Sequence, residues 1–123
     1  MTISEALAKF KTLHPSGIEE KVLVDFLSEL DGRVAEEILE SADAAGMGLP
    51  YDPDSDRNKT LLVPFPHDSI YITWLQAKTD YHNNEYDRFN NDMILFNTEW
   101  TSYANTYLRR HGTTQANQMI ARL

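Results

Sequence analysis

The feature that most constrains this chain is a repeat of large apolar side chains between residues 86 and 107. The intervals alternate between three and four residues, and the repeat comprises Tyr86, Phe89, Met93, Phe96, Trp100, Tyr103 and Tyr107. This spacing places all of them on one face of a helix, in the pattern by which one helix packs along another. We therefore expect a long C-terminal helix whose aromatic face is buried against a neighbour.

Asparagines border this repeat. Asn90 and Asn97 each follow a repeat position by one residue, and asparagine is a mediocre helix former, so their presence needs a reason. At the edge of a packed face, their amides would reach a neighbouring helix or a buried tyrosine hydroxyl. Contact with another protein is the alternative use. The predicted helix-packing set is Tyr71, Trp74, Asn90, Phe96, Asn97 and Trp100.

Shorter helical patterns precede the long helix. Thr2 with Glu5, and Ser16 with Glu19, fit reciprocal capping at two helix starts. Apolar residues then recur at helical spacing up to residue 39, and again over residues 70–81. The residues "YHNNE" favour a break before the last helix, although one continuous helix is also compatible with the spacing. We expect an all-α fold of four to five helices, with residues 1–112 as a single domain and 113–123 as a tail or arm.

The segment 46–66 interrupts the helical patterns, because its glycines and prolines exclude a regular helix. Its run "TLLV" is β-prone, so we expect a small hairpin with "GLPY", an irregular loop, or a strand that pairs with another subunit. The tail ends in apolar residues on a segment too short to bury itself. The candidate subunit interface is therefore Leu61, Leu62, Val63, Met119, Ile120 and Leu123.

Charge and composition exclude several classes of protein. The 123 residues carry a net charge of −8, which opposes binding to nucleic-acid phosphates or to an anionic membrane surface. Most of this acidity lies in residues 1–43. The absence of cysteine excludes thiol chemistry and disulfides. Without an apolar run of spanning length or a signal-peptide pattern, we expect a protein that is made in a cytoplasm and does not enter a membrane.

One acidic segment suggests a metal site. Asp52, Asp54, Asp56 and Asn58 occupy alternate positions, as in a calcium-binding loop. Arg57 then stands where the tight turn needs glycine, and the residue expected to be a bidentate glutamate is valine. A solvated acidic turn is the preferred interpretation. The histidines and serines match no catalytic motif, so we predict no enzyme activity and no cofactor.

Residues 60–110 also carry a family resemblance. The segment "VPFPHDSIYITWLQAKTDYHNNEYDRFNNDMILFNTEWTSYANTYLRR" is similar to small head–tail connector, adaptor or head-completion proteins of tailed bacteriophages and prophages. The matching positions are Pro64, Pro66, Asp68, Tyr71, Trp74, Leu75, Ala77, Asp80, Glu85, Asn90, Asn91, Phe96 and Asn97. The resemblance implies a mostly helical, non-enzymatic virion subunit that joins a ring between portal and tail, and that contacts the portal and tail-completion proteins.

Three functional hypotheses follow. The first is this connector subunit, assembled in the host bacterial cytoplasm and located in the virion, with DNA passing through the ring without specific binding. An acidic surface suits such a channel, because it repels phosphate. The second is a small helical protein-binding module or regulator of phage or prophage origin, acting as a monomer or dimer. The third is a calcium-dependent binding protein that uses the acidic segment.

Overall fold

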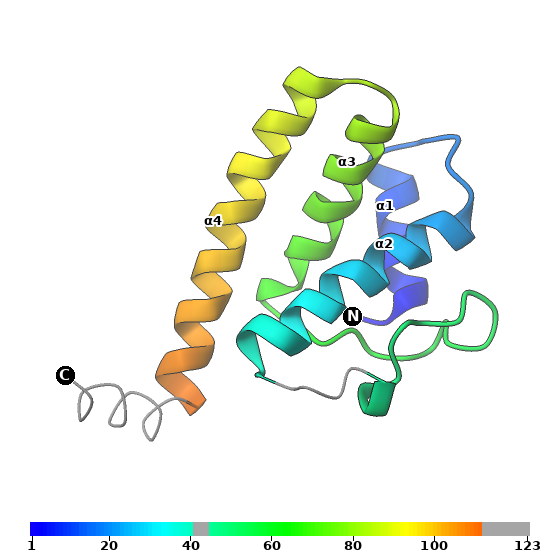
Figure 1. Ribbon diagram of the computed structural model, residues 1–123. Helices are drawn as coiled ribbons and strands as arrows, with labels where there is room; N and C mark the ends of the chain where they lie inside the picture. The colour runs from blue at the N-terminus through cyan, green and yellow to red at the C-terminus, as the bar shows by residue number, and fades with distance from the viewer. Residues whose placement is uncertain (41–44, 112–123) are drawn as a thin grey trace.

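The computed structural model describes residues 1–40 and 45–111, and these residues form four α-helices and no strand (Figure 1). The helices are α1 (Ile3–Leu13), α2 (Glu20–Arg33), α3 (Ile70–His82) and α4 (Tyr86–His111). Short helical turns lie at η1 (Val34–Ile38), η2 (Ala45–Met47) and η3 (His67–Ser69). The expected all-α fold with a long C-terminal helix is confirmed, and the predicted tail lies outside the described residues.

The starts of α1 and α2 differ in how they are capped. The Glu5 amide donates to Thr2 Oγ1 at 3.1 Å, and the Thr2 amide donates to Glu5 Oε1 at 3.3 Å, as predicted. The second predicted capping pair is wrong, because α2 begins at Glu20 after an N-cap residue without a side-chain cap. Gly17 would have been the first helical residue there, and glycine loses the most backbone freedom in a helix.

Helix α3 lies at the centre of the molecule. It packs against α1 and α2 on one side and against α4 on the other (Figure 1). Its buried residues surround the helix and comprise Ile70, Tyr71, Ile72, Trp74, Leu75, Ala77, Thr79 and Asp80. A helix that is buried all round needs partners on every side. Of the four α-helices, α4 is therefore the one that closes the far side of the core.

The chain reverses between α3 and α4, which settles the choice between one continuous helix and two. Asn84 has a φ of +60°, in the left-handed region that asparagine tolerates better than most residues. The Glu85 amide donates to the carbonyl of Asp80 at 2.8 Å and closes the turn. The two helices then run antiparallel, side by side (Figure 1).

The segment that precedes η3 is an irregular loop, and the alternative of a hairpin between "GLPY" and "TLLV" is not formed. Thr60 instead makes an isolated antiparallel bridge with Thr2. The Leu61 amide donates to the Met1 carbonyl at 2.9 Å, and the Ile3 amide donates to the Lys59 carbonyl at 3.0 Å. The β-prone run is thus held by the N-terminal residues of the same chain.

The buried apolar side chains of the four α-helices and of the loop, apart from Ala77, belong to one core cluster. Within the part of the chain that the structure describes, no helix is both long and apolar enough to span a bilayer.

Candidate functional site

The predicted subunit interface in the loop is wrong for two of its three residues. Leu61 and Val63 are 2% and 0% exposed, so their side chains belong to the core of their own protomer. Leu62, between them, is half-buried. The predicted tail residues Met119, Ile120 and Leu123 lie outside the described residues.

A buried carboxylate explains why the loop folds inward. Asp31 of α2 is fully buried, and both of its oxygens accept hydrogen bonds. The hydroxyls of Tyr51 and Tyr71 donate to Oδ2 and Oδ1, each at 2.5 Å, and the Leu62 amide donates to Oδ2 at 3.1 Å. Burying an ionised carboxylate costs several kcal/mol unless such donors compensate it. Asp31 therefore ties α2, the loop and α3 together.

The same cluster satisfies further backbone groups of the loop. Tyr71 Oη accepts from the Val63 amide at 2.7 Å, and Ser28 Oγ accepts from the Tyr51 amide at 2.9 Å. Side chains thus replace the strand partner that a hairpin would have supplied, which is the physical reason for the irregular loop. We call Ser28, Asp31, Tyr51 and Tyr71 the Asp31 cluster.

Burial dominates the electrostatics of the Asp31 cluster. It raises the pKa of Asp31, and the bonds donated by Tyr51, Tyr71 and Leu62 act in the opposite direction. Burial, followed by the nearby Asp31 charge, raises the pKa values of Tyr51 and Tyr71 well above the ordinary tyrosine range. Both hydroxyls therefore stay protonated and remain donors. With its groups sealed in the core and bonded to one another, the cluster acts as a structural tie.

The acidic segment predicted as a weak metal candidate forms a turn that caps itself. Asp52 Oδ1 accepts from the amides of Asp54 and Ser55, each at 2.8 Å, and these bonds lower the pKa of Asp52. Asp56 Oδ2 accepts from the Asp52 amide at 2.7 Å, and Asp56 Oδ1 lies 3.3 Å from Lys59 Nζ. Among the described residues, no group of three or more histidine or acidic side chains is arranged to hold a metal ion.

The aromatic members of the predicted helix-packing set lie close together between α3 and α4. The ring centroids of Trp74 and Phe96 are 5.0 Å apart, and those of Phe96 and Trp100 are 5.9 Å apart. The Trp74 indole donates to the Phe26 carbonyl at 2.7 Å. The Arg33 guanidinium carbon lies 5.0 Å from the Trp100 ring centroid. The aromatic repeat is therefore the packed face of α4, although only Phe96 and Tyr103 are fully buried and Tyr86, at its start, is 53% exposed.

The two asparagines of the same set do not take part in this packing. Asn90 and Asn97 are exposed, and neither side chain bonds to another of the described residues. The expected hydrogen bonds from α4 to a neighbouring helix are thus wrong for the described part of the chain. One position beyond the repeat turns a side chain by about 100° around the helix, which is too far to reach α3.

A second pair of acids meets between α3 and α4. Asp80 is 4% exposed and accepts two bonds from Gln76 Nε2, at 2.9 and 3.0 Å. Burial, and then the neighbouring Asp80, raise the pKa of Asp92 to about 7, against a smaller opposing effect of Arg88. Asp92 Oδ2 is buried without a bonding partner, so a proton there would supply the missing donor toward Asp80. We therefore expect the contact between the two helices to depend on pH.

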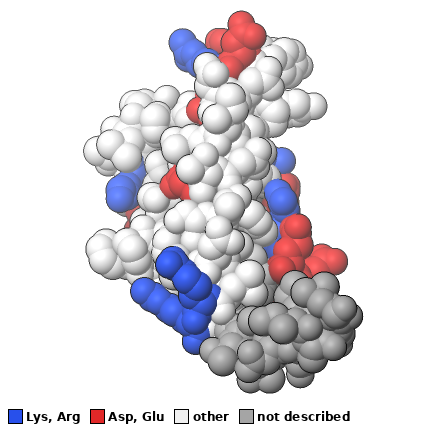
Figure 2. All heavy atoms as spheres, turned by 90° about the vertical axis from the view of Figure 1, so that its left-hand side faces the viewer, with Lys and Arg blue, Asp and Glu red and all other residues white. Residues whose placement is uncertain are grey.

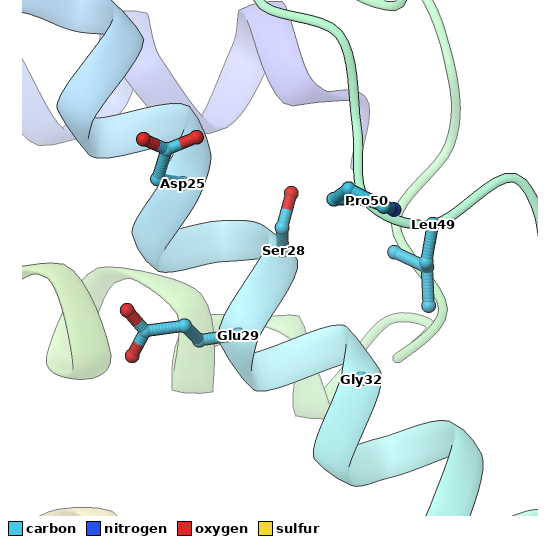
Figure 3. Close-up of a pocket in the computed structure, with 6 residues that line it drawn as sticks. All are labelled: Asp25, Ser28, Glu29, Gly32, Leu49 and Pro50. Carbon is cyan, nitrogen blue, oxygen red and sulfur yellow. The ribbon is translucent and has the colours of Figure 1, made fainter. Parts of the chain in front are cut away.

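A shallow hollow of about 390 Å³ lies between α2 and the loop (Figure 3). Its polar groups do not converge, because the carboxylates of Asp25 and Glu29 point away from Leu49 and Pro50 in Figure 3. Ser28 Oγ already accepts from Tyr51, and Glu29 pairs with Lys78 at 3.0 Å. A small-molecule site normally has a few polar groups aimed at one point. This hollow lacks that arrangement.

The side of α4 that faces away from α3 is the most unusual surface of the described residues. We call it the outer face of α4, and it consists of Asp87, Asn91, Ile94, Leu95, Thr98, Thr101, Ser102, Asn105 and Arg109, all exposed. Ile94 and Leu95 are 67% and 54% exposed. The helical spacing of these residues places them on one side of α4, opposite the aromatic repeat.

The outer face is uncharged between its two ends. Figure 2 shows a largely uncharged surface along α4, with charged side chains toward the two ends. The acids of this part of α4 lie to one side, since Asp92 interacts with Asp80 and Glu99 Oε2 accepts from Ser69 Oγ at 2.7 Å. In a chain with a net charge of −8, an uncharged face with exposed aliphatic side chains is typical of a protein-contact surface.

Sequence reasoning missed both the Asp31 cluster and the outer face of α4. Asp31 follows Leu23 and Leu27 at intervals of four, so an acid at a core position of an apolar stripe was the available signal. The outer face repeats at intervals of three and four, as the aromatic face does, but with small polar residues that give a weaker signal.

Comparison with known proteins adds no family to this description. No family model matches the chain. No curated protein and no solved structure is significantly similar to it either. The resemblance of residues 60–110 to phage connector proteins therefore stays a prediction.

Proposed function

We propose that this chain is a non-enzymatic structural subunit that works by binding other protein chains, as a head–tail connector or adaptor of a tailed bacteriophage or prophage. The outer face of α4 carries the proposal, because an exposed, uncharged face on an acidic protein is suited to protein contact. The resemblance of residues 60–110 supports the phage role. The subunit would assemble in the bacterial cytoplasm and reside in the virion.

The buried polar groups support a structural role. The Asp31 cluster is bonded within the core, and Asp52 and Asp56 accept bonds from the backbone of their own loop segment. These groups hold the loop and helices in place and present no converging set to a substrate. A protomer whose loop and helices are held in this way is suited to serve as an assembly subunit.

A ring between portal and tail would need a second, different surface on each subunit. The exposed acids of α2 and η1 would instead face the channel of such a ring, and the set comprises Asp25, Glu29, Glu36 and Glu37. An acidic surface facing the channel would repel DNA phosphate and let the genome pass without binding. The expected partners are further copies of the chain, the portal ring and tail-completion proteins.

The test combines the purified chain with the portal protein encoded nearest to its gene. We expect rings, or portal rings with bound chain, in negative-stain images and in sedimentation velocity. Leu95→Lys should weaken this assembly. Leu13→Lys on α1 is the matched control, because Leu13 and Leu95 are similarly exposed, at 55% and 54%. Monomer alone, with and without portal protein, would contradict the proposal.

The second candidate function is that of a helical protein-binding module or regulator. A contact face confined to a single helix is also compatible with this role. A gene neighbourhood without capsid, portal and tail genes would favour this role over the connector.

A further inference from the structure

The two ends of the outer face of α4 carry opposite charges. Asp87 lies in the first turn of the helix and Arg109 in the last, each eleven positions from Thr98. Neither residue has an ion-pair partner among the described residues. Both lie on the same side of the helix as Thr98, because eleven residues are close to three full turns. The face is therefore acidic at one end, basic at the other and uncharged between them.

We infer that the outer face of α4 binds the same face of a second copy of this chain, with the two helices antiparallel about a two-fold axis at Thr98. This pairing goes beyond the proposed function and rests on it only for the premise that α4 is a contact surface; a paired copy must release this face before it joins a ring. The antiparallel arrangement sets Asp87 of each copy opposite Arg109 of the other. Charge complementarity of this kind selects orientation and register.

The residues between the charged ends are paired by the same symmetry. Asn91 and Asn105 lie at equal distances from Thr98, so each amide of one copy meets an amide of the other. Asparagine side chains both donate and accept, and such pairs are self-complementary. The side chains of Asn91 and Asn105, which bond to none of the described residues of their own protomer, would thereby gain partners.

The surface shapes of the two copies also fit each other in this register. Thr98, Thr101, Ser102 and Asn105 line a shallow hollow on the outer face of α4, next to the projecting side chains of Ile94 and Leu95. A two-fold axis at Thr98 sets Ile94 and Leu95 of one copy against Thr101 and Ser102 of the other. The aliphatic ridge of each copy then fits the hollow of the other, twice per dimer. Ridges packed into grooves are the ordinary basis of close helix pairs.

A parallel pair is disfavoured by the same charges. It would place Asp87 against Asp87 and Arg109 against Arg109, and it would also align the two helix dipoles. The antiparallel contact extends over about 33 Å of helix at 1.5 Å per residue. One helix pair buries less surface than the roughly 1,200–2,000 Å² of a stable interface. The dimer is therefore reversible and dissociates on dilution and at high salt.

The chain contains no cysteine, which allows a direct geometric test by disulfide cross-linking. Thr98→Cys lies on the proposed axis and should give a covalent dimer under mild oxidation. Asn91→Cys and Asn105→Cys should each stay uncross-linked alone and form a covalent dimer when mixed, because only residue 91 of one copy meets residue 105 of the other. Ala8→Cys, exposed on α1, is the matched control and should remain monomeric.

A charge exchange tests the same register without oxidation. Asp87→Arg alone and Arg109→Asp alone should each weaken dimerisation about tenfold in sedimentation experiments, because both contacts in the dimer become repulsive. Mixing the two variants, or combining both changes in one chain, should restore dimerisation. Circular dichroism melting curves verify that the variants stay folded.

Two results would overturn the inference. One is Thr98→Cys cross-linking no faster than Ala8→Cys, and the other is cross-linking of Asn91→Cys alone as efficiently as the mixture. In either case, the occupant of the outer face of α4 would be residues 112–123 of the same chain or a different protein. Rings or portal binding that disappear with Leu95→Lys would then still support the proposed function. Conversely, cross-linking at residue 98 without any portal binding would leave the pairing intact and contradict the connector role.

Discussion

The Asp31 cluster and the outer face of α4 differ in where their polar and apolar side chains lie. In the Asp31 cluster, polar groups lie in the core, and each oxygen of the central carboxylate has a donor from the same chain. On the outer face of α4, large aliphatic side chains are exposed, and no neighbour among the described residues covers them. The first region places polar atoms where apolar ones are expected, and the second does the reverse.

The difference shows where each region finds its partners. A buried charge must be matched within the protomer, because removing any donor leaves an expensive unpaired group. An exposed aliphatic face needs no internal partner and contributes little to folding. Substitutions in the two regions should therefore separate stability from assembly, and the following predictions run from the largest expected effect to the smallest.

Removing the central carboxylate should have the largest effect. Asp31→Ala would leave the hydroxyls of Tyr51 and Tyr71 and the Leu62 amide buried without an acceptor. We expect the free energy of unfolding to fall by about 3–5 kcal/mol, measured by chemical denaturation. Asp25→Ala, an exposed position on the same helix, should change it by less than about 0.5 kcal/mol. Equal stability of the two variants would refute the role given to Asp31.

Removing a single hydroxyl of the cluster should cost less. Tyr71→Phe loses the bond donated to Asp31 and the bond accepted from the Val63 amide. The expected loss is about 1–3 kcal/mol in the free energy of unfolding. Tyr81→Phe is the control on the same helix, because Tyr81 is 55% exposed. If both variants unfold at the same denaturant concentration, the cluster does not hold the loop as described.

The contact between Asp80 and Asp92 predicts a pH effect. The pKa of Asp92 is raised to about 7, whereas an unfolded aspartate titrates near 4. Between about pH 4 and pH 7 the folded state therefore holds a proton that the unfolded state has released. Because the folded state binds more protons in this range, the free energy of unfolding falls as the pH rises. Asp92→Asn should reduce that slope, measured as melting temperature against pH. Asp87→Asn, exposed on the same helix, should retain it.

Changing the outer face of α4 should have the smallest effect on folding. Leu95→Lys is expected to alter the free energy of unfolding by no more than about 0.5 kcal/mol, as is Leu13→Lys. Thermal melts of dilute protein, at which any dimer has dissociated, would measure this. A loss of several kcal/mol would mean that Leu95 belongs to the fold and that its exposure has another cause.

Much of the fold could be predicted from the sequence because it depends on local periodicity. The aromatic repeat from Tyr86 to Tyr107 predicted α4 and its buried face, and the pair Thr2 and Glu5 predicted the start of α1. The break after α3 was favoured but left open. It depends on Asn84 adopting a left-handed conformation, which its sequence neighbours allow but do not require.

The candidate sites were harder to predict because they depend on distant contacts. Tyr51 and Tyr71 lie twenty and forty residues from Asp31 along the chain. Without those partners, only its place four residues after Leu27 in the apolar stripe separates Asp31 from the exposed acids of α2. Leu61 and Val63 were assigned to a subunit interface for the same reason, since the partners of their amides, the Met1 carbonyl and the Tyr71 hydroxyl, are distant in sequence and no local pattern reveals them. The outer face of α4 lacked the strong apolar signal by which buried faces are found.

The position of α4 has a practical consequence for spectroscopy. The two tryptophans of the chain lie on the facing helices α3 and α4, with Phe96 near both. Trp74 is 7% exposed, whereas Trp100 lies partly buried beneath the Arg33 guanidinium. The chain thus contains two native fluorophores at the seam between α4 and the rest of the core. Their emission can follow the release of α4 in real time, without an attached dye.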